Sequence, residues 1–228
     1  MRHHEIVMEK LNLVYDPELD KSVVEMNFID EVNIEGDNVS VSMRLPTYWC
    51  SPNFAFIMAE DIRDRVMEIP WVKNFNFNLK DHSASEAINK GVAEGKSFSE
   101  VFSDMASGDL NEVRKKFQIK SYIARQEKLL RDLINFGMDK ELLSLTINEL
   151  ESHSAIQDRA VLNRYLTLNK DLGLSSHPND LAFKKHTGER IEPLELKDYL
   201  LEARRTRMSM EFNGIYCRGL LDTRYQTK

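Results

Sequence analysis

The sequence predicts an α+β protein, in which a small two-layer domain of helix, strand, strand, helix and strand precedes an all-helical region. Three observations predict this fold. Residues 28–45 and 75–80 alternate apolar and polar side chains with the period of two that a half-buried strand requires. Residues 5–14 and 52–69 repeat their apolar side chains every three or four positions, as one face of a helix does. Beyond about residue 83 we find only the helical period.

A helix and a hairpin open the predicted domain. Val7, Leu11 and Val14 lie on one helical stripe. Pro17 ends this helix, because the residue before a proline is pushed out of the α region. The alternation that follows is interrupted at Gly36-Asp37-Asn38, which favours a tight turn between two strands. We therefore expect these two strands to pair as a hairpin.

A second helix and a third strand complete the predicted domain. Ser51 is a favoured N-cap and Pro52 a favoured first helical residue. The apolar residues of this helix share one face: Phe54, Met58, Ile62, Val66 and Ile69. Pro70 ends the helix, and Phe75 and Phe77 then alternate with asparagines in a third strand. Each strand has one apolar side, so we expect helices to cover one face of the sheet and water to reach the other.

The change of pattern also predicts the domain boundaries. Residues 1–82 form the α/β domain, residues 83–108, with three glycines, form a linker, and residues 109–228 form a helical domain with an extended tail. The first helix of that domain begins with a capping box at residues 109–112. The helices expected there cover residues 109–136, 140–150, 161–172 and 193–203.

Composition excludes several classes of protein. No segment approaches the roughly 18 apolar residues of a membrane span, and no apolar stretch follows the charged first residues as in a secretory signal. The two cysteines cannot form a disulfide framework, which indicates a reduced, cytoplasmic chain. Residues 1–82 carry 8 basic and 15 acidic side chains, a net charge of −7. This acidic half argues against nucleic-acid binding, because a surface that contacts phosphates is cationic.

Few residues in the sequence could carry chemistry. The motifs for nucleotide binding, the hydrolase nucleophile elbow and the zinc-protease helix are all absent, and no base stands beside a thiol, so we expect no enzyme. Cys50 stands out because it follows a strand and directly precedes an N-cap. The positive end of a helix favours the thiolate, which binds soft metals or attacks electrophiles. The alternative is a small buried apolar side chain at a strand end.

Four segments of the sequence, in this order along the chain, match the pattern of a known family. They are residues 14–19 (Val-Tyr-Asp-Pro-Glu-Leu), residues 23–29, residues 45–50 (Leu-Pro-Thr-Tyr-Trp-Cys) and residues 69–73. With these segments, residues 8–82 resemble the PaaD- and SufT-like domain of iron–sulfur cluster assembly factors. The Asp-Pro-Glu-Leu tetrapeptide and the Thr-x-x-Cys loop are specific in combination. The resemblance implies the helix–strand–strand–helix–strand fold and a role in maturing an iron–sulfur or other metal centre without catalysed turnover.

The resemblance also implies a site and a cargo. Asp16 and Cys50 match the acidic and thiol positions of the family's pocket, with Cys50 as the metal ligand, and Thr47 matches the hydroxyl beside it. The implied cargo is iron or an iron–sulfur cluster held transiently, and the implied partners are a client metalloenzyme or other assembly proteins. Longer proteins similar to this one are associated with multicomponent di-iron monooxygenases.

Where the family usually has Gly-Cys-Pro, this chain has Trp49 and Ser51 around the cysteine, so the tryptophan either closes the pocket or forms a docking surface.

Several alternatives stay open on the sequence alone. Cys217, in the aromatic segment 212–220, either completes a site with Cys50 or belongs to a tail that packs its aromatic side chains on the core. His82 either approaches the cysteine loop or is a solvated or capping side chain. The second function that remains is a non-catalytic adaptor or dedicated chaperone with no metal of its own. The acidic domain and the apolar helices are compatible with a homodimer.

Overall fold

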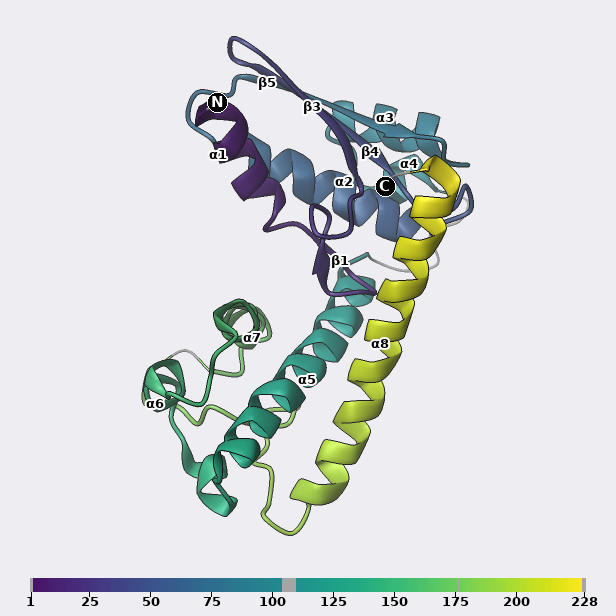
Figure 1. Cartoon of the computed structure of the whole chain (residues 1–228). Helices are drawn as coiled ribbons and strands as arrows, with labels where there is room; N and C mark the ends of the chain where they lie inside the picture. The colour runs from purple at the N-terminus through teal and green to yellow at the C-terminus, as the bar shows by residue number, and fades with distance from the viewer. Residues whose placement is uncertain (1, 104–109, 176, 227–228) are drawn as a thin grey trace. The chain divides into compact units, whose positions relative to one another are not determined.

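The computed structural model describes residues 2–103, 110–175 and 177–226 of the chain, drawn in Figure 1. The chain divides into two compact units, one made of residues 1–114 and 212–228 and the other of residues 115–211. Each unit has its own hydrophobic core. The mixed α+β class predicted from the sequence is confirmed.

A three-stranded sheet lies at the centre of the first unit. Its strands are β3 (Ile29–Glu35), β4 (Asn38–Arg44) and β5 (Asn74–Lys80), in that order. Strands β3 and β4 form the predicted antiparallel hairpin, whose turn places Gly36 at a φ of +65° that glycine adopts without strain. Strands β4 and β5 pair in parallel, and the helix α2 (Pro52–Met67) is the crossover connection that a parallel pair requires.

The two faces of this sheet differ as the sequence predicts. Val39, Val41 and Met43 of β4 are buried in one core with α2 and with α1 (Arg2–Leu11). The opposite face carries polar side chains and ion pairs, in which Asp30 pairs with Arg44 at 3.0 Å and with Lys80 at 2.7 Å. The helices therefore cover one face of the sheet, and charged groups cover the other.

A second, two-stranded sheet was not predicted. It consists of β1 (Tyr15–Asp16) and β2 (Lys21–Ser22), which pair antiparallel. Two residues per strand are too few to show a period of two, which is why the sequence pattern carries no signal for it. The turn between them places Asp20 at a φ of +48°, a region that aspartate tolerates better than most residues. This small sheet holds Asp16 in a defined position.

The segment expected as a linker has helical structure where it is described. It contains α3 (Ser85–Ala93) and α4 (Phe98–Val101), while residues 104–108 lie outside the described part of the chain. Four of its apolar side chains are buried in the core of the first unit: Ile88, Val92, Phe98 and Phe102. The side chain of Asn89 accepts from the N–H of Leu79 at 2.7 Å and donates to its carbonyl at 3.2 Å. It thereby takes the place of a further strand at the edge of β5.

The second unit is built from helices, as the sequence predicts. Tyr122 and Tyr165 stack at its centre with ring centroids 5.2 Å apart, and the Tyr165 hydroxyl donates to the Ala182 carbonyl at 2.6 Å. The elements around this centre are most of α5 (Leu110–Phe136), a 3-10 helix η1 (Lys140–Ser144), α6 (Ile147–Ser152), α7 (Arg159–Asp171) and the first turns of α8 (Leu196–Tyr225).

The C-terminal segment differs from the expected extended tail. Helix α8 does not end near residue 203 but continues to Tyr225, and residues 212–225 of it belong to the first unit. Gly214 and Gly219 lower the helix propensity of this stretch by about 1 kcal/mol each, but tertiary packing outweighs propensity. Leu221 is fully buried in the core of the first unit. Although α8 is long, neither it nor any other described helix is apolar enough to cross a membrane.

We predict that Gly91→Ala destabilises the protein by about 1–2 kcal/mol, although alanine is the better helix former. A Cβ at Gly91 would overlap Cγ2 of Val101 in α4 and lie 3.4 Å from the Phe56 ring. Gly219 is the matched control, because a Cβ there meets nothing within 4 Å. Gly219→Ala should stabilise α8 by up to about 1 kcal/mol. Urea unfolding of both variants measures the difference, and equal stabilisation would show that α3 does not pack against α4.

Candidate functional site

A cavity of about 130 Å³ in the first unit contains most of the residues that the sequence assigned to a site. Asp16, Cys50 and Cys217 line it. Thr47 stands next to it, because its Oγ1 lies 3.3 Å from Cys50 Sγ in a hydrogen bond. The rest of the wall consists of Glu18 and Ser51 and of apolar residues, namely Leu19, Phe28, Leu45, Pro46, Phe54 and Met58. Polar and thiol groups thus meet in a largely apolar surrounding, where electrostatic interactions are strong.

Cys50 is held between the end of β4 and the start of α2. Its N–H donates to the Thr47 carbonyl at 3.5 Å, and α2 begins two residues later at Pro52. Ser51 is the N-cap residue but makes no side-chain cap bond, so it does not compensate the positive end of the helix. The thiol is half-buried and faces the cavity. The neighbouring Trp49 is 78% exposed and does not line the cavity, so the tryptophan does not close the pocket.

His82 binds the backbone of the cysteine loop. Its Nδ1 accepts from the Ala84 N–H at 3.1 Å, so Nε2 carries the proton and donates to the Cys50 carbonyl at 2.8 Å. Burial lowers the pKa of His82, and the charge of Arg224 lowers it further, while the bond to the Cys50 carbonyl opposes the shift. His82 is therefore a buried neutral histidine that approaches the cysteine loop through its backbone, and not a solvated side chain.

Asp16 is a buried carboxyl group on the cavity wall. Its Oδ1 accepts from the N–H groups of Glu18 and Leu19, both at 2.9 Å. Burial raises the pKa of Asp16 to about 6, although the two N–H bonds lower it, and the nearby Glu18 charge adds to the rise. An aspartate that titrates so close to neutral pH can take up or release a proton there. A carboxyl with such a shifted pKa in a cavity is typical of a functional site.

Cys217 reaches the same cavity from α8. Burial raises the pKa of its thiol to about 11, and the negative charges of Asp16, Cys50 and Glu18 raise it as well. The thiol is therefore protonated at neutral pH. Cys217 and Cys50 are both free thiols in the structure. The sequence left the association of Cys217 with Cys50 open, because no pattern links two residues so far apart in the chain.

The thiols and the carboxyl do not form a complete metal site. Within the described residues, no group of three or more His, Cys, Asp or Glu side chains is arranged to hold a metal ion. Two thiols suit a soft metal such as iron, but they fill only part of the four-coordinate shell of a closed site.

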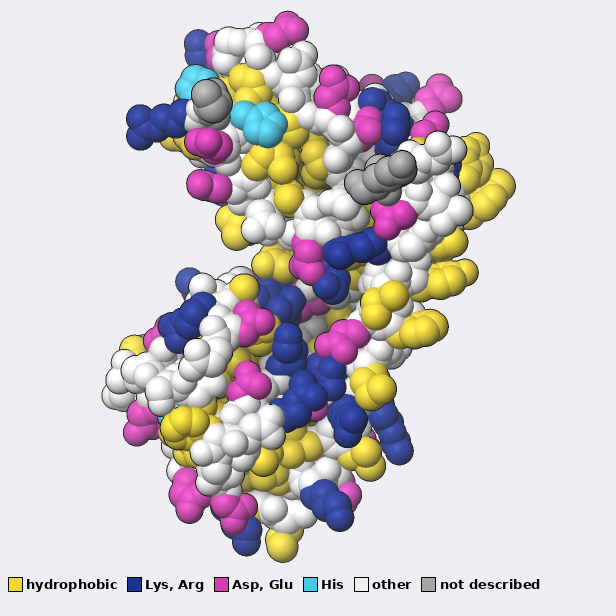
Figure 2. All heavy atoms as spheres, viewed as in Figure 1, with side chains coloured by type: hydrophobic (Ala, Val, Ile, Leu, Met, Phe, Trp, Pro, Cys, Tyr) yellow, Lys and Arg dark blue, Asp and Glu magenta, His cyan; other side chains and the backbone are white. Residues whose placement is uncertain are grey.

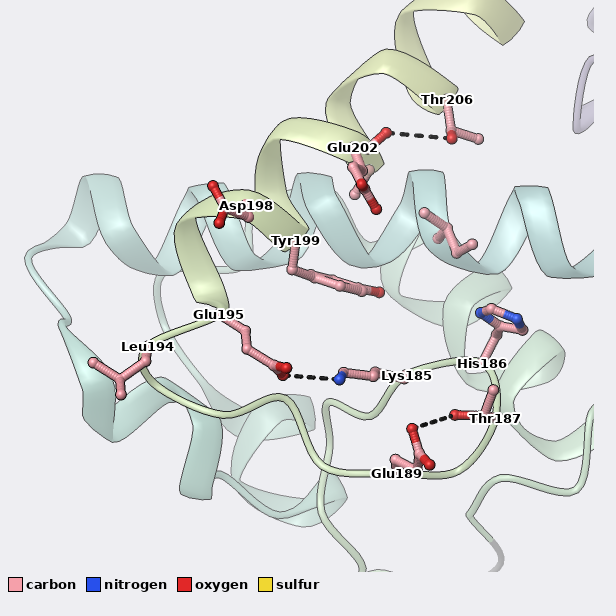
Figure 3. A pocket seen from close by; sticks show the side chains of 12 residues that line it. Lys185, His186, Thr187, Glu189, Leu194, Glu195, Asp198, Tyr199, Glu202 and Thr206 are labelled. Carbon is pink, nitrogen blue, oxygen red and sulfur yellow. Dashed lines mark hydrogen bonds and ion pairs between the residues drawn. The ribbon is translucent and has the colours of Figure 1, made fainter.

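The second unit has a larger cavity of about 540 Å³, shown in Figure 3. Its walls are Ile123 of α5, the chain from Lys185 to Glu195 and the first turns of α8. In Figure 3 the Tyr199 ring lies between Glu202 on one side and the ion pair of Lys185 with Glu195, 2.8 Å long, on the other. No cysteine lines this cavity. Sequence reasoning missed it because its walls come from α5 and from residues 185–206, two segments that are distant in the chain.

We predict that Asp16→Asn raises the free energy of unfolding at pH 7.5 by about 1–3 kcal/mol. Asparagine can still accept the two N–H bonds with Oδ1 but carries no charge that burial penalises. Because the pKa of Asp16 is raised from 3.8 to about 6 on folding, its contribution to stability is fully present below 3.8 and is lost as the pH rises through about 6. The gain of the variant should therefore shrink towards zero at pH 4. Urea unfolding across this range measures it.

Asp37 provides a control, because its pKa is shifted in the direction opposite to that of Asp16. A hydrogen bond from Lys73 lowers the pKa of Asp37, so its contribution to stability is present above its unfolded pKa and is lost as the pH falls. Asp37→Asn should therefore lose stability at pH 7.5 and approach the wild type in acid. A gain for Asp16→Asn that does not change with pH would show that the burial of the carboxylate charge is not its cause.

A known protein family matches the part of the chain that contains Asp16, Thr47 and Cys50. Residues 4–76 match the model of a family described as iron-sulfur cluster assembly protein. The match includes Asp16, Thr47 and Cys50 and ends within β5. No curated protein and no solved structure matches the chain. Residues 4–76 therefore form an iron–sulfur cluster assembly domain of the PaaD/SufT type within a longer chain.

Proposed function

We propose that this protein is an accessory factor that receives iron or an iron–sulfur cluster at Cys50 and passes it to a client metalloenzyme. One observation carries the proposal: the thiol of the assembly domain faces a cavity that it shares with the buried carboxyl of Asp16. The family is one of assembly proteins and not of catalysts, which supports an accessory role without turnover. Both cysteines are free thiols, which suits a reducing compartment such as the cytoplasm.

The site residues have separate roles in this proposal. A thiol must lose its proton to bind a metal, and the carboxylate of Asp16, with a pKa of about 6, can accept a proton at the cavity wall. The Thr47 hydroxyl holds Cys50 Sγ through their hydrogen bond. His82 fixes the loop by its bond to the Cys50 carbonyl. Together these contacts keep one sulfur oriented towards a small, mostly apolar space.

An incomplete set of ligands supports transfer in preference to storage. Closed structural metal sites use four protein ligands, whereas a site that hands over its metal must leave positions open for the ligands of the recipient. The described residues hold no group of three metal-binding side chains. A client metalloenzyme would supply the missing ligands, and the client implied by the resemblance is a multicomponent di-iron monooxygenase.

Exposed aromatic side chains beside the two cysteines offer a surface for such a client. Trp49 precedes Cys50, is 78% exposed and stacks edge-on against Tyr48 with ring centroids 4.8 Å apart. Tyr216 precedes Cys217 and is also exposed. Phe212 and Ile215 of α8 are exposed as well. Figure 2 shows apolar side chains on the surface along α8. Aromatic residues are enriched where proteins bind one another.

Replacing the thiol tests the proposal. Cys50→Ser should leave the thermal midpoint within about 2 °C of the wild type, because the side chain is half-buried and keeps its size. It should abolish delivery of iron to the client, because a serine hydroxyl does not replace a thiolate as a soft-metal ligand. Iron content and activity of the client, matured in the presence of each variant, measure delivery. Ser42→Ala, in β4 and outside the cavity, is the control. Full client activity with Cys50→Ser would refute the assembly role.

A second candidate function is an adaptor that holds the client through the helical unit. The observation that favours it is the cavity of Figure 3, whose apolar floor is surrounded by carboxylates. Of these, Glu195 is paired with Lys185, whereas the side chains of Asp198 and Glu202 have no ion-pair partner among the described residues. We propose that this cavity receives a basic side chain of the client, because a cation would complement the unpaired carboxylates.

Charge reversal tests the adaptor function. Asp198→Lys and Glu202→Lys should each weaken binding of the client by about tenfold or more, since a like charge replaces an opposite one at the contact. Asp171→Lys, on an exposed residue at the end of α7 outside the cavity, is the control and should bind as the wild type does. Calorimetric titration of the purified client measures the affinities. Unchanged affinity in both cavity variants would refute this role for the cavity, whatever the outcome for Cys50.

A further inference from the structure

The cavity of the assembly domain contains one group that the family match does not reach. Cys217 lies on α8, far beyond residue 76, where the match ends. We infer that Cys217 is the second sulfur ligand of the site, so that the cavity binds a thiophilic metal ion between one thiol of the assembly domain and one thiol of the C-terminal helix. This inference rests on the proposed function of Cys50 and adds a ligand and a structural element to it.

The first argument is the placement of the two thiols. Cys50 and Cys217 both line the same cavity of about 130 Å³. They are near enough that a charge on Cys50 affects the titration of Cys217. Two sulfurs that share one metal ion lie about 4 Å apart, given a metal–sulfur bond of about 2.3 Å. A cavity of this size can accommodate that separation together with the ion.

The second argument is the way in which α8 is fastened on both sides of Cys217. Before it in the chain, the Asn213 side chain donates to the Glu18 carboxylate at 3.4 Å. After it, Arg218 Nη2 donates to the Glu25 carbonyl at 2.6 Å. Glu18 lies in the turn between the two strands of the small sheet that carries Asp16, and Glu25 follows the second strand. The thiol is thus brought to the cavity by contacts with the same segment that positions the carboxyl.

The third argument is the electrostatic surrounding of the thiol. A cysteine that only packs is expected among apolar groups, where its protonated form is stable. Cys217 shares its cavity not only with apolar side chains but also with Asp16, Glu18 and a second thiol. These are the groups whose repulsion a bound cation would relieve, because each of them is negative when ionised. The polar side of the cavity therefore suits a cation.

Binding involves proton release and no redox step. A divalent ion and two thiols give a metal dithiolate and two protons, and no electron is transferred. One proton can pass to the Asp16 carboxylate and the other to water. The pKa of Cys217, about 11, means that its proton is still bound before the metal arrives. Metal affinity should therefore rise with pH in the wild type.

Cobalt(II) titration of the full chain without oxygen tests the inference, because thiolate ligands give cobalt a charge-transfer absorption in the near ultraviolet. We expect the absorption per bound cobalt to fall by about half in Cys217→Ser and in Cys50→Ser, and the affinity to fall about tenfold or more in each. Tyr216→Phe, on the exposed neighbour, is the control. Circular dichroism and thermal melting show whether each variant is folded.

The outcomes separate this inference from the proposed function. If Cys217→Ser binds as the wild type does while Cys50→Ser loses the absorption, the second ligand is refuted and the assembly site stands. If Cys50→Ser keeps the full absorption, both are refuted. No absorption in the wild type would likewise refute a two-thiol site.

Phenylarsine oxide provides a readout that does not depend on metal binding or on a folded variant. This reagent bridges two neighbouring thiols, so the wild type should take up one molecule per chain and lose its reactivity towards a maleimide at both cysteines. Intact-mass spectrometry measures the adduct. Either single serine variant should lose the stable adduct, and a wild type that forms none would refute the pairing of Cys50 with Cys217.

Discussion

The return of residues 212–225 of α8 to the α/β unit is the contact on which the arrangement of the site depends. Leu221 is buried in the core, and Arg224 donates to the carbonyls of Leu45 and Asp81 at 3.2 and 2.7 Å. Bonds from a charged donor are stronger than those between neutral groups, so they can hold a helix that contains two glycines. Because the carbonyls belong to chain segments that leave β4 and β5, the helix is fastened to the ends of the strands next to the cysteine loop.

The site combines a buried acid with groups that are uncharged at neutral pH. Burial keeps His82 neutral by lowering its pKa and keeps Cys217 protonated by raising its pKa to about 11. Asp16, with a pKa of about 6, is largely ionised there, at a cost to stability. Functional sites commonly hold such a group at the expense of the fold. A cationic cargo would offset that cost, which links occupancy of the site to stability of the assembly domain.

The helical unit is held together by buried polar contacts as well as by its apolar core. Arg207 Nε lies 2.6 Å from Glu127 Oε2 in an ion pair of two largely buried side chains, and Arg207 also pairs with Glu211 at 2.6 Å. The Tyr199 hydroxyl donates to Gln126 Oε1 at 3.0 Å, which fixes the ring that lies in the cavity of Figure 3. Breaking such pairs leaves a buried charge without a partner, so they define one arrangement of α5 and α8 within this unit.

The sequence by itself determined the sheet and the helix after Ser51, because alternation and capping are properties of residues that are close in the chain. The neighbourhood of Asp16 with Cys50 was implied by the resemblance to the assembly domain. Only the tertiary structure decided that α3 and α4 pack into the core. The need for a glycine at position 91, for example, follows from its close approach to Val101, ten residues away. The tertiary structure also decided that α8 continues past its glycines and carries Cys217 to Cys50. The reason is physical: local signals report backbone preference and the buried side of an element, whereas the partner of that side is chosen by contacts between distant segments, which leave no periodic trace in the sequence.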